Sequence, residues 1–342
     1  MEKKNFQKIL IIQTAFIGDL ILATGVIEKL HQFYPQAEID IIVKKENREV
    51  LAFHPYIHEI ISFDKSKKVG GIFTIVSKIR KRKYDLVVNL HRFAATGLIT
   101  FLSKGKIKVG YDKNPLSFTY TKSFPHIINE GGNTPHEIER NHALIAEFTD
   151  SVPAKPKIYW NETDLKVVKI YQKQNYICIA PSSVWYTKQL PEEKWVDFIK
   201  SIPEEFTVNL IGAVGDISLC ERIKNNSRRN NVKVLAGSLS IKQSAALMKG
   251  ALMNFVNDSA PLHIASAANA PVTAIFCSTV PVFGFGPLSD HSRIVQVDYP
   301  LECKPCGLHG YKHCPLGHFK CGNDIKISYL LENFKEVVST VG

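Results

Sequence analysis

Short apolar runs alternate repeatedly with helix-like segments along this chain. Strand-sized runs alternate with stretches in which apolar residues recur at helical spacing, first across residues 8–111 and again across residues 176–276. Near-continuous apolar strands that alternate with helices are typical of a parallel sheet covered on both faces. The sequence therefore predicts an α/β protein with two doubly wound, Rossmann-like domains.

The expected elements fall into two groups separated by a proline-containing segment. The expected strands are residues 8–13, 38–43, 84–90 and 108–111 in the first group, and 176–181, 206–212, 232–237, 251–258 and 271–276 in the second. Because residues 150–156 hold two prolines and little periodicity, we place the linker there. We expect an N-terminal domain over 1–155 and a C-terminal domain over 156–324. The last helix, 325–341, could pack back onto the first domain.

Apolar runs and charge suggest where the protein works. No apolar run approaches the roughly 20 residues of a membrane-spanning helix, and the first residues hold too few apolar side chains for a signal-peptide core. We therefore expect a cytoplasmic protein. The net charge is +11, and residues 65–83 carry eight basic residues and no acidic one. Such a segment suits a phosphate-rich partner, whether nucleic acid, anionic lipid or phosphorylated glycolipid; the alternative is a solvated helix face.

The first candidate site follows the first expected strand, because open α/β sheets bind ligands beyond the carboxyl ends of their strands. Gly18 permits a tight turn there, and Asp19 opens the next helix. A cap of that helix is the structural interpretation of Asp19, and a general base is the functional one. The loop lacks the G-x-G-x-x-G pattern, which argues against a nicotinamide dehydrogenase.

A second candidate site follows the expected strand 251–258. Asp258, Ser259 and Ala260 precede a helix that we expect to start at Pro261. Backbone N–H groups at a helix start, together with a serine hydroxyl, can bind a diphosphate. His263 lies two residues inside that helix and is expected to face the same crevice.

A third candidate site follows the expected strand 176–181. The loop contains Ser182 and Ser183 and then Lys188. A lysine in this position could neutralise a leaving diphosphate. Taken alone, Lys188 would be interpreted as a surface charge, so its assignment depends on the other two loops.

Four of the seven cysteines lie close together near the C-terminus, at Cys303, Cys306, Cys314 and Cys321. In a cytosolic chain such clustering indicates metal binding or free thiols before it indicates disulfides. A zinc ion is one interpretation. We favour reduced thiols in a compact loop, because the second cysteine pair does not have the C-x2-C spacing.

Three segments carry a resemblance to a known family. Residues 9–43, 257–276 and 303–321 resemble the ADP-heptose:lipopolysaccharide heptosyltransferases, glycosyltransferase family 9, and the cysteine segment is similar to that of heptosyltransferase II members. The resemblance implies a GT-B fold, in which two domains face a central cleft. It implies an acceptor on the first domain and an ADP-sugar on the second. It also implies inverting transfer of a heptose to the lipopolysaccharide inner core, without a catalytic metal. The basic segment 65–83 would then hold phosphates of the acceptor and keep the enzyme at the inner face of the cytoplasmic membrane.

The resemblance also assigns roles to residues. Asp19 matches the catalytic base and Lys188 the lysine that contacts the diphosphate. Donor contacts are implied for Ser182, Ser183, Asp216 at the ribose, Leu239 near the adenine, Asp258, Ser259, Ala260 and His263. Ala260 replaces the glycine of the donor motif. Acceptor contacts are implied for Gly18, His91 and Arg92.

Two other functions remain open from the sequence. One is a nucleotide-sugar-binding protein without transferase activity, whose cysteine segment would hold zinc. The other is a transferase that uses a different nucleotide sugar.

Overall fold

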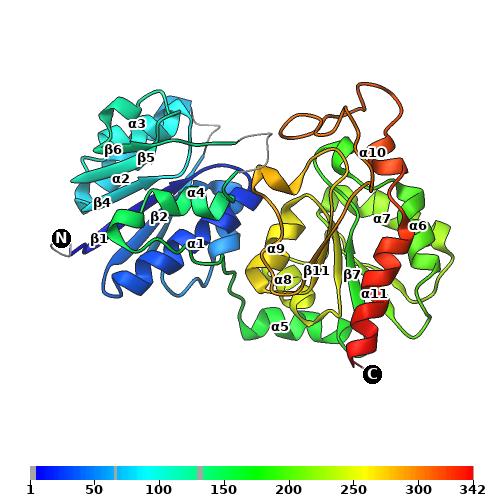
Figure 1. Ribbon diagram of the computed structural model, residues 1–342. Helices are drawn as coiled ribbons and strands as arrows, with labels where there is room; N and C mark the ends of the chain where they lie inside the picture. The colour runs from blue at the N-terminus through cyan, green and yellow to red at the C-terminus, as the bar shows by residue number, and fades with distance from the viewer. Residues whose placement is uncertain (1–4, 65–67, 129–133, 342) are drawn as a thin grey trace. The chain divides into compact units, whose positions relative to one another are not determined.

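The structure is a computed structural model that describes residues 5–64, 68–128 and 134–341 (Figure 1). The chain forms two compact units, Met1–Tyr159 and Trp160–Gly342, so the division falls at Tyr159 rather than at residue 155. Each unit is one continuous stretch of chain, and each contains one six-stranded sheet whose neighbouring strands are all parallel.

The first unit is a doubly wound sheet with strand order β3-β2-β1-β4-β5-β6. Its strands are β1 Lys8–Gln13, β2 Glu38–Lys44, β3 Glu59–Phe63, β4 Leu86–Asn89, β5 Ile107–Tyr111 and β6 Lys122–Phe124. Its helices are α1 Ile17–Phe33, α2 Lys68–Arg82, α3 Ala94–Leu102 and α4 Glu137–Ala143. Helices α1 and α4 pack together, as do α2 and α3, and the latter pair shares a buried apolar cluster with β1, β2 and β4.

The second unit repeats this architecture with strand order β12-β11-β10-β7-β8-β9. Its strands are β7 Tyr176–Ala180, β8 Thr207–Leu210, β9 Val232–Val234, β10 Asn254–Asn257, β11 Val272–Ile275 and β12 Ser292–Val295. Its helices are α5 Glu162–Val168, α6 Glu192–Lys200, α7 Ile217–Ser227, α8 Ile241–Gly250, α9 Ala260–Ala268, α10 Lys320–Asn323 and α11 Ile327–Val341. Short 3-10 helices include η6 Tyr186–Lys188 and η7 Val214–Asp216.

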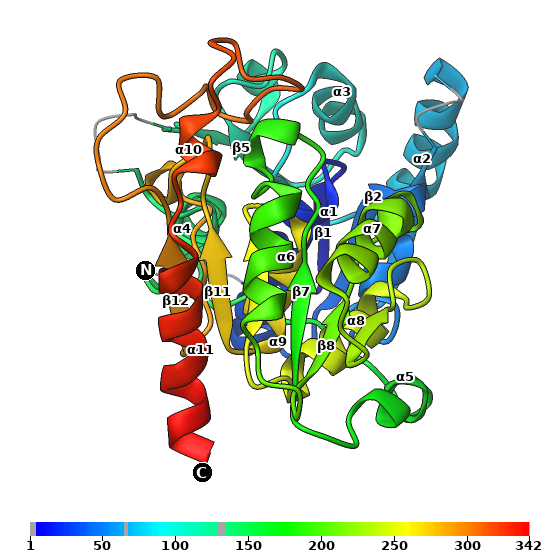
Figure 2. The same ribbon diagram turned by 90° about the vertical axis from the view of Figure 1, so that its right-hand side faces the viewer.

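The last helix belongs to the second unit. Leu330 and Phe334 of α11 are buried in the same apolar cluster as Trp195 and Phe198 of α6, and Figure 2 shows α11 running beside β12. The sequence had suggested a return to the first domain. The amphipathic face of α11 is instead used to complete the core of its own unit.

The strand orders identify where ligands should bind. Counted from its own first strand, each sheet has the order 3-2-1-4-5-6, so the direction of winding reverses between β1 and β4 and between β7 and β10. Doubly wound sheets bind ligands at this switch point, beyond the carboxyl ends of the strands. The loops predicted from the sequence follow β1, β7 and β10, which all border a switch point.

Candidate active site

Asp19 lies in the first turn of α1, directly after β1, and its side chain is partly exposed. The backbone N–H groups of Phe16 and Asp19 favour the charged form of its carboxylate. The N-cap of α1 is Phe16, with no side-chain cap hydrogen bond, so Asp19 is not the cap that the sequence offered as the alternative. Burial and the negative charge of Glu137 raise the pKa of Asp19 to about 6, although those N–H groups and Arg92 act in the opposite direction. At pH 7 this carboxylate is mostly ionised and is well matched to accept a proton.

His91 and Arg92 follow β4 on the other side of the first switch point. Asn89 accepts a hydrogen bond from the His91 backbone N–H at 3.0 Å, which fixes the start of the loop. The His91 Nδ1 atom lies 3.1 Å from the Thr14 hydroxyl, so this contact joins the loops after β1 and β4. Because Arg92 lowers the pKa of Asp19, its charge acts at the same place.

A buried charged cluster at the start of α4 was not predicted. The Oε2 atom of Glu137 accepts hydrogen bonds from Arg140 Nη2 at 2.7 Å and Nε at 2.8 Å, and His126 Nε2 lies 3.5 Å away. Burial alone would raise the pKa of Glu137, but His126 and Arg140 outweigh it and lower that pKa. Glu137 therefore remains charged and raises the pKa of Asp19. Its position at a helix start, far along the chain from β1, gave no sequence signal.

Lys188 and Asp258 form an ion pair that bridges the second switch point. Lys188 ends η6 after β7, Asp258 follows β10, and their Nζ and Oδ2 atoms are 2.6 Å apart. The side chains are only 14% and 8% exposed. Thr279 donates a hydrogen bond of 2.6 Å to the same Oδ2 atom. Thr279 was missed, although it follows β11 and the strand-end rule could have found it.

Ser182, Asp216 and Ser259 join the loop after β8 to the loops after β7 and β10. The Ser182 hydroxyl donates to Asp216 Oδ1 at 2.6 Å, and Asp216 Oδ2 accepts from the Ala213 N–H at 2.7 Å. The Ser259 hydroxyl donates to the Ser182 carbonyl at 3.4 Å. The loops after β7, β8 and β10 therefore meet at the carboxyl edge of the sheet.

The other predicted donor residues lie along this edge. Helix α9 begins at Ala260, one residue earlier than expected, with Ser259 as its N-cap. His263 is buried in α9, and its ring centroid is 6.2 Å from that of Phe285. Leu239 is half-buried between β9 and α8, and the Ser183 carbonyl accepts from Gln189 at 2.7 Å.

The four clustered cysteines all carry free thiols, with Cys321 buried and the others partly exposed. Within the residues that the structure describes, no group of three or more His, Cys, Asp or Glu side chains is arranged to hold a metal ion.

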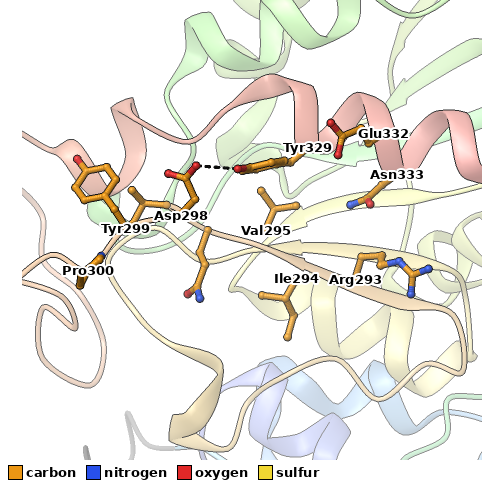
Figure 3. A pocket seen from close by; sticks show the side chains of 11 residues that line it. Arg293, Ile294, Val295, Asp298, Tyr299, Pro300, Tyr329, Glu332 and Asn333 are labelled. Carbon is orange, nitrogen blue, oxygen red and sulfur yellow. Dashed lines mark hydrogen bonds between the residues drawn. The ribbon is translucent and has the colours of Figure 1, made fainter.

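A groove of about 580 Å³ lies elsewhere in the second unit, between the edge strand β12 and α11 (Figure 3). Asp298 and Tyr329 face each other across it and are joined by a hydrogen bond of 2.8 Å. None of the predicted site residues lines this groove. Because β11 separates β12 from β10, the groove does not border the switch point.

The predicted basic segment is mostly helix α2, while residues 65–67 lie outside the described residues. Arg82 pairs with Glu38 at 2.8 Å and Asp40 at 3.1 Å, and Lys78 pairs with Glu59. Part of the positive charge is therefore neutralised by β2 and β3, while Arg80, Lys81 and Lys83 are exposed. Among the helices of the described ranges, none combines the length and apolar character that crossing a membrane requires.

Comparison with known sequences gives one family. The model of glycosyltransferase family 9 (heptosyltransferase) matches residues 72–312. Lipopolysaccharide heptosyltransferase 3 of Escherichia coli is 26% identical over 284 residues, which cover 78% of this chain and 83% of the relative. Lipopolysaccharide heptosyltransferase 2 of Escherichia coli K12 is 22% identical over 310 residues, covering 85% and 88%.

Solved structures agree on the fold. The ADP-heptose lipopolysaccharide heptosyltransferase II of Escherichia coli superimposes with a TM-score of 0.79 at 20% identity, over 98% of this chain and 99% of the other. A family 9 glycosyltransferase from Veillonella parvula gives a TM-score of 0.83 at 17% identity, over 99% of each chain. The two Rossmann-like domains thus have the GT-B fold expected from the sequence. From the match of the family model, together with this fold, the chain belongs to glycosyltransferase family 9, the heptosyltransferases, and is a glycosyltransferase.

Proposed function

We propose that the protein transfers a heptose, or a related sugar, from an ADP-sugar to the inner core of lipopolysaccharide. The transfer would be a direct displacement that inverts the anomeric carbon and uses no catalytic metal. The observation that carries this proposal is Asp19, a partly exposed carboxylate with a pKa of about 6 at the carboxyl end of β1.

Asp19 is the general base in this mechanism. It accepts the proton of the acceptor hydroxyl as the oxygen attacks the anomeric carbon and the bond to the diphosphate breaks. Because the attack is direct, no enzyme nucleophile is required. Gly18, His91 and Arg92 border the same switch point and are the proposed acceptor contacts, with Arg92 suited to an acidic or phosphorylated sugar.

The second unit supplies the donor contacts. In the proposed reaction, negative charge builds on the ADP leaving group, and Lys188 and the N–H groups at the start of α9 stabilise it. Asp258 pairs with Lys188, and Thr279 donates a hydrogen bond to the same oxygen of Asp258. The proposal assigns Ser182, Ser183, Ser259, Ala260 and His263 to the diphosphate side, and Asp216 and Leu239 to the nucleoside.

The lipid-linked acceptor suggests a peripheral place on the inner face of the cytoplasmic membrane. The exposed basic residues of α2 and its end, Arg80, Lys81 and Lys83, would meet anionic headgroups or phosphates of the acceptor.

Calorimetric titration of ADP, UDP and GDP tests the donor assignment. We expect ADP to bind best and Lys188→Met to weaken it. Lys242→Met is the matched control, because Lys242 also forms a largely buried pair with an aspartate, Asp164, at 3.8 Å. Tighter binding of UDP or GDP would remain consistent with a transferase but would contradict an ADP-sugar as the donor. An equal loss of ADP affinity in Lys188→Met and Lys242→Met would contradict the assignment of Lys188 to the donor site.

Turnover of ADP-heptose with a lipopolysaccharide-core acceptor tests the reaction itself. Asp19→Asn should abolish turnover while ADP affinity stays close to that of the wild type. Binding of ADP without turnover in the wild type would instead support the alternative, a nucleotide-sugar-binding protein.

A further inference from the structure

The cysteine-rich segment, residues 303–321, is hydrogen-bonded to the loop that carries Lys188. Thr187 is the neighbour of Lys188 in the chain and is 1% exposed. Its N–H donates to the Tyr311 carbonyl at 3.1 Å, and the Tyr311 N–H donates to the Thr187 hydroxyl at 2.8 Å. Because Thr187 is buried, breaking one of these bonds leaves a buried polar group of Thr187 without its partner.

The same segment is bonded to the loop that carries Thr279. The hydroxyl of Ser278, the neighbour of Thr279, donates to the Thr187 hydroxyl at 3.0 Å. The Ser278 N–H donates to the Thr187 carbonyl at 3.2 Å, and the Cys306 N–H donates to the Ser278 carbonyl at 2.7 Å. Three segments are therefore joined at one point. Lys188 and Thr279, which both bond to the Oδ2 atom of Asp258, each lie one residue from that point.

Gly310 brings the segment into direct contact with Lys188. Its φ of +73° is one that residues with side chains rarely adopt. A Cβ atom at this position would lie 2.8 Å from the Thr187 hydroxyl, 2.9 Å from the Ser278 hydroxyl and 3.1 Å from Lys188 Cγ. Only a glycine allows so close an approach.

We infer that the cysteine-rich segment positions Lys188 and Thr279 on Asp258, with Gly310, Thr187 and Ser278 as the positioning residues. The segment thus acts on the donor site through Thr187 and Ser278. This rests on the proposed function in one respect, namely that the Lys188–Asp258 pair belongs to the donor site.

The test compares two alanine substitutions within the segment. Gly317 also has a φ of +73°, but a Cβ atom there would meet nothing within 4 Å. Gly310→Ala and Gly317→Ala therefore carry the same backbone strain, and only Gly310→Ala pushes on Thr187, Ser278 and Lys188. We expect Gly310→Ala to weaken ADP binding and lower kcat/KM for the donor by about tenfold to a hundredfold, and Gly317→Ala to stay within about twofold of wild type.

A second pair of variants removes the hydroxyl instead. Thr187→Val should reproduce the Gly310→Ala loss, and Thr187→Ser should restore activity because it keeps the hydroxyl. Thr273→Val controls for the loss of a buried threonine hydroxyl, since Thr273 is fully buried in β11. If Gly310→Ala does not fold, this series decides the question.

A readout that needs no nucleotide separates this inference from the proposed function. The rate at which an amine-reactive reagent labels Lys188, followed by mass spectrometry, should rise in Gly310→Ala and Thr187→Val but not in Gly317→Ala or Thr273→Val. Equal labelling in all four variants would overturn the inference. Wild-type protein that binds no nucleotide would overturn the proposed function and leave the labelling result to decide the inference.

Discussion

The raised pKa of Asp19 predicts that Asp19→Asn makes the protein inactive and more stable at once. An acid whose pKa is 3.8 unfolded and about 6 folded binds its proton more tightly in the folded state. Its contribution to stability is therefore greatest below pH 3.8 and is lost as the pH rises through 6. A difference of roughly two pKa units corresponds to about 3 kcal/mol at pH 8, an upper limit because the side chain is partly exposed.

Urea unfolding of both proteins at pH 5 and pH 8 measures this effect. Groups that do not interact with Asp19 cancel in the comparison. The linkage relation then predicts that the stability advantage of Asp19→Asn grows by about 1.4 kcal/mol from pH 5 to pH 8. Turnover should fall by about 10²- to 10⁴-fold, the usual contribution of a general base.

Asp85→Asn is the control, because the pKa of Asp85 is lowered in the folded state whereas that of Asp19 is raised. Burial acts to raise the pKa of Asp85, but Lys106 and the N–H groups of Gln7 and Lys8 outweigh it and lower that pKa. The charge of Asp85 therefore stabilises the fold above pH 4, so Asp85→Asn should be less stable by a similar amount at pH 5 and pH 8. If the stability advantage of Asp19→Asn over the wild type does not grow between pH 5 and pH 8, the folded state does not destabilise the ionised carboxylate of Asp19. Unchanged turnover would remove Asp19 as the base.

Three further predictions concern the pH dependence of catalysis, the exposed basic residues at the end of α2 and the need for a metal. The acidic limb of the kcat/KM profile should lie near pH 6, moving to lower pH in Glu137→Gln and to higher pH in Arg92→Gln, because the two charges act on Asp19 in opposite directions; shifts in the same direction would contradict this. Reversing the charge of Arg80, Lys81 and Lys83 together should weaken sedimentation with anionic vesicles or raise the acceptor KM; if neither changes, the helix is only a solvated face. Dialysis against a chelator should leave turnover within about twofold, whereas a loss restored by added divalent cation would mean that the transfer needs a metal.

The strands that could be predicted from the sequence are those with mostly buried, apolar residues. Every residue of β4, β7, β10 and β11 is buried. The strands that were missed, β3, β6 and β12, all lie at sheet edges, where one side faces solvent and the apolar pattern is weak. The fourth edge strand, β9, was predicted as part of residues 232–237, so an edge position weakens the apolar pattern without always removing it.

The site could be predicted only as far as local sequence determines it. Asp19, Lys188 and Asp258 each follow a strand that borders a switch point, so topology alone selects their loops. The residues that act on these side chains or their loops come from distant parts of the chain. Glu137 raises the pKa of Asp19, and Tyr311 is hydrogen-bonded to Thr187, the neighbour of Lys188. Such pairings depend on tertiary packing, which a single sequence does not reveal.

The two strand orders, each contained in one continuous stretch of chain, have an evolutionary consequence. In the proposed mechanism the proton acceptor lies wholly within Met1–Tyr159, and the groups that hold the leaving diphosphate lie wholly within Trp160–Gly342. Substitutions that retune the loops of one unit leave the core of the other untouched. A lineage can therefore change which sugar chain it extends while its nucleotide preference is inherited unaltered, and descendants of one ancestor can diversify on the acceptor side alone.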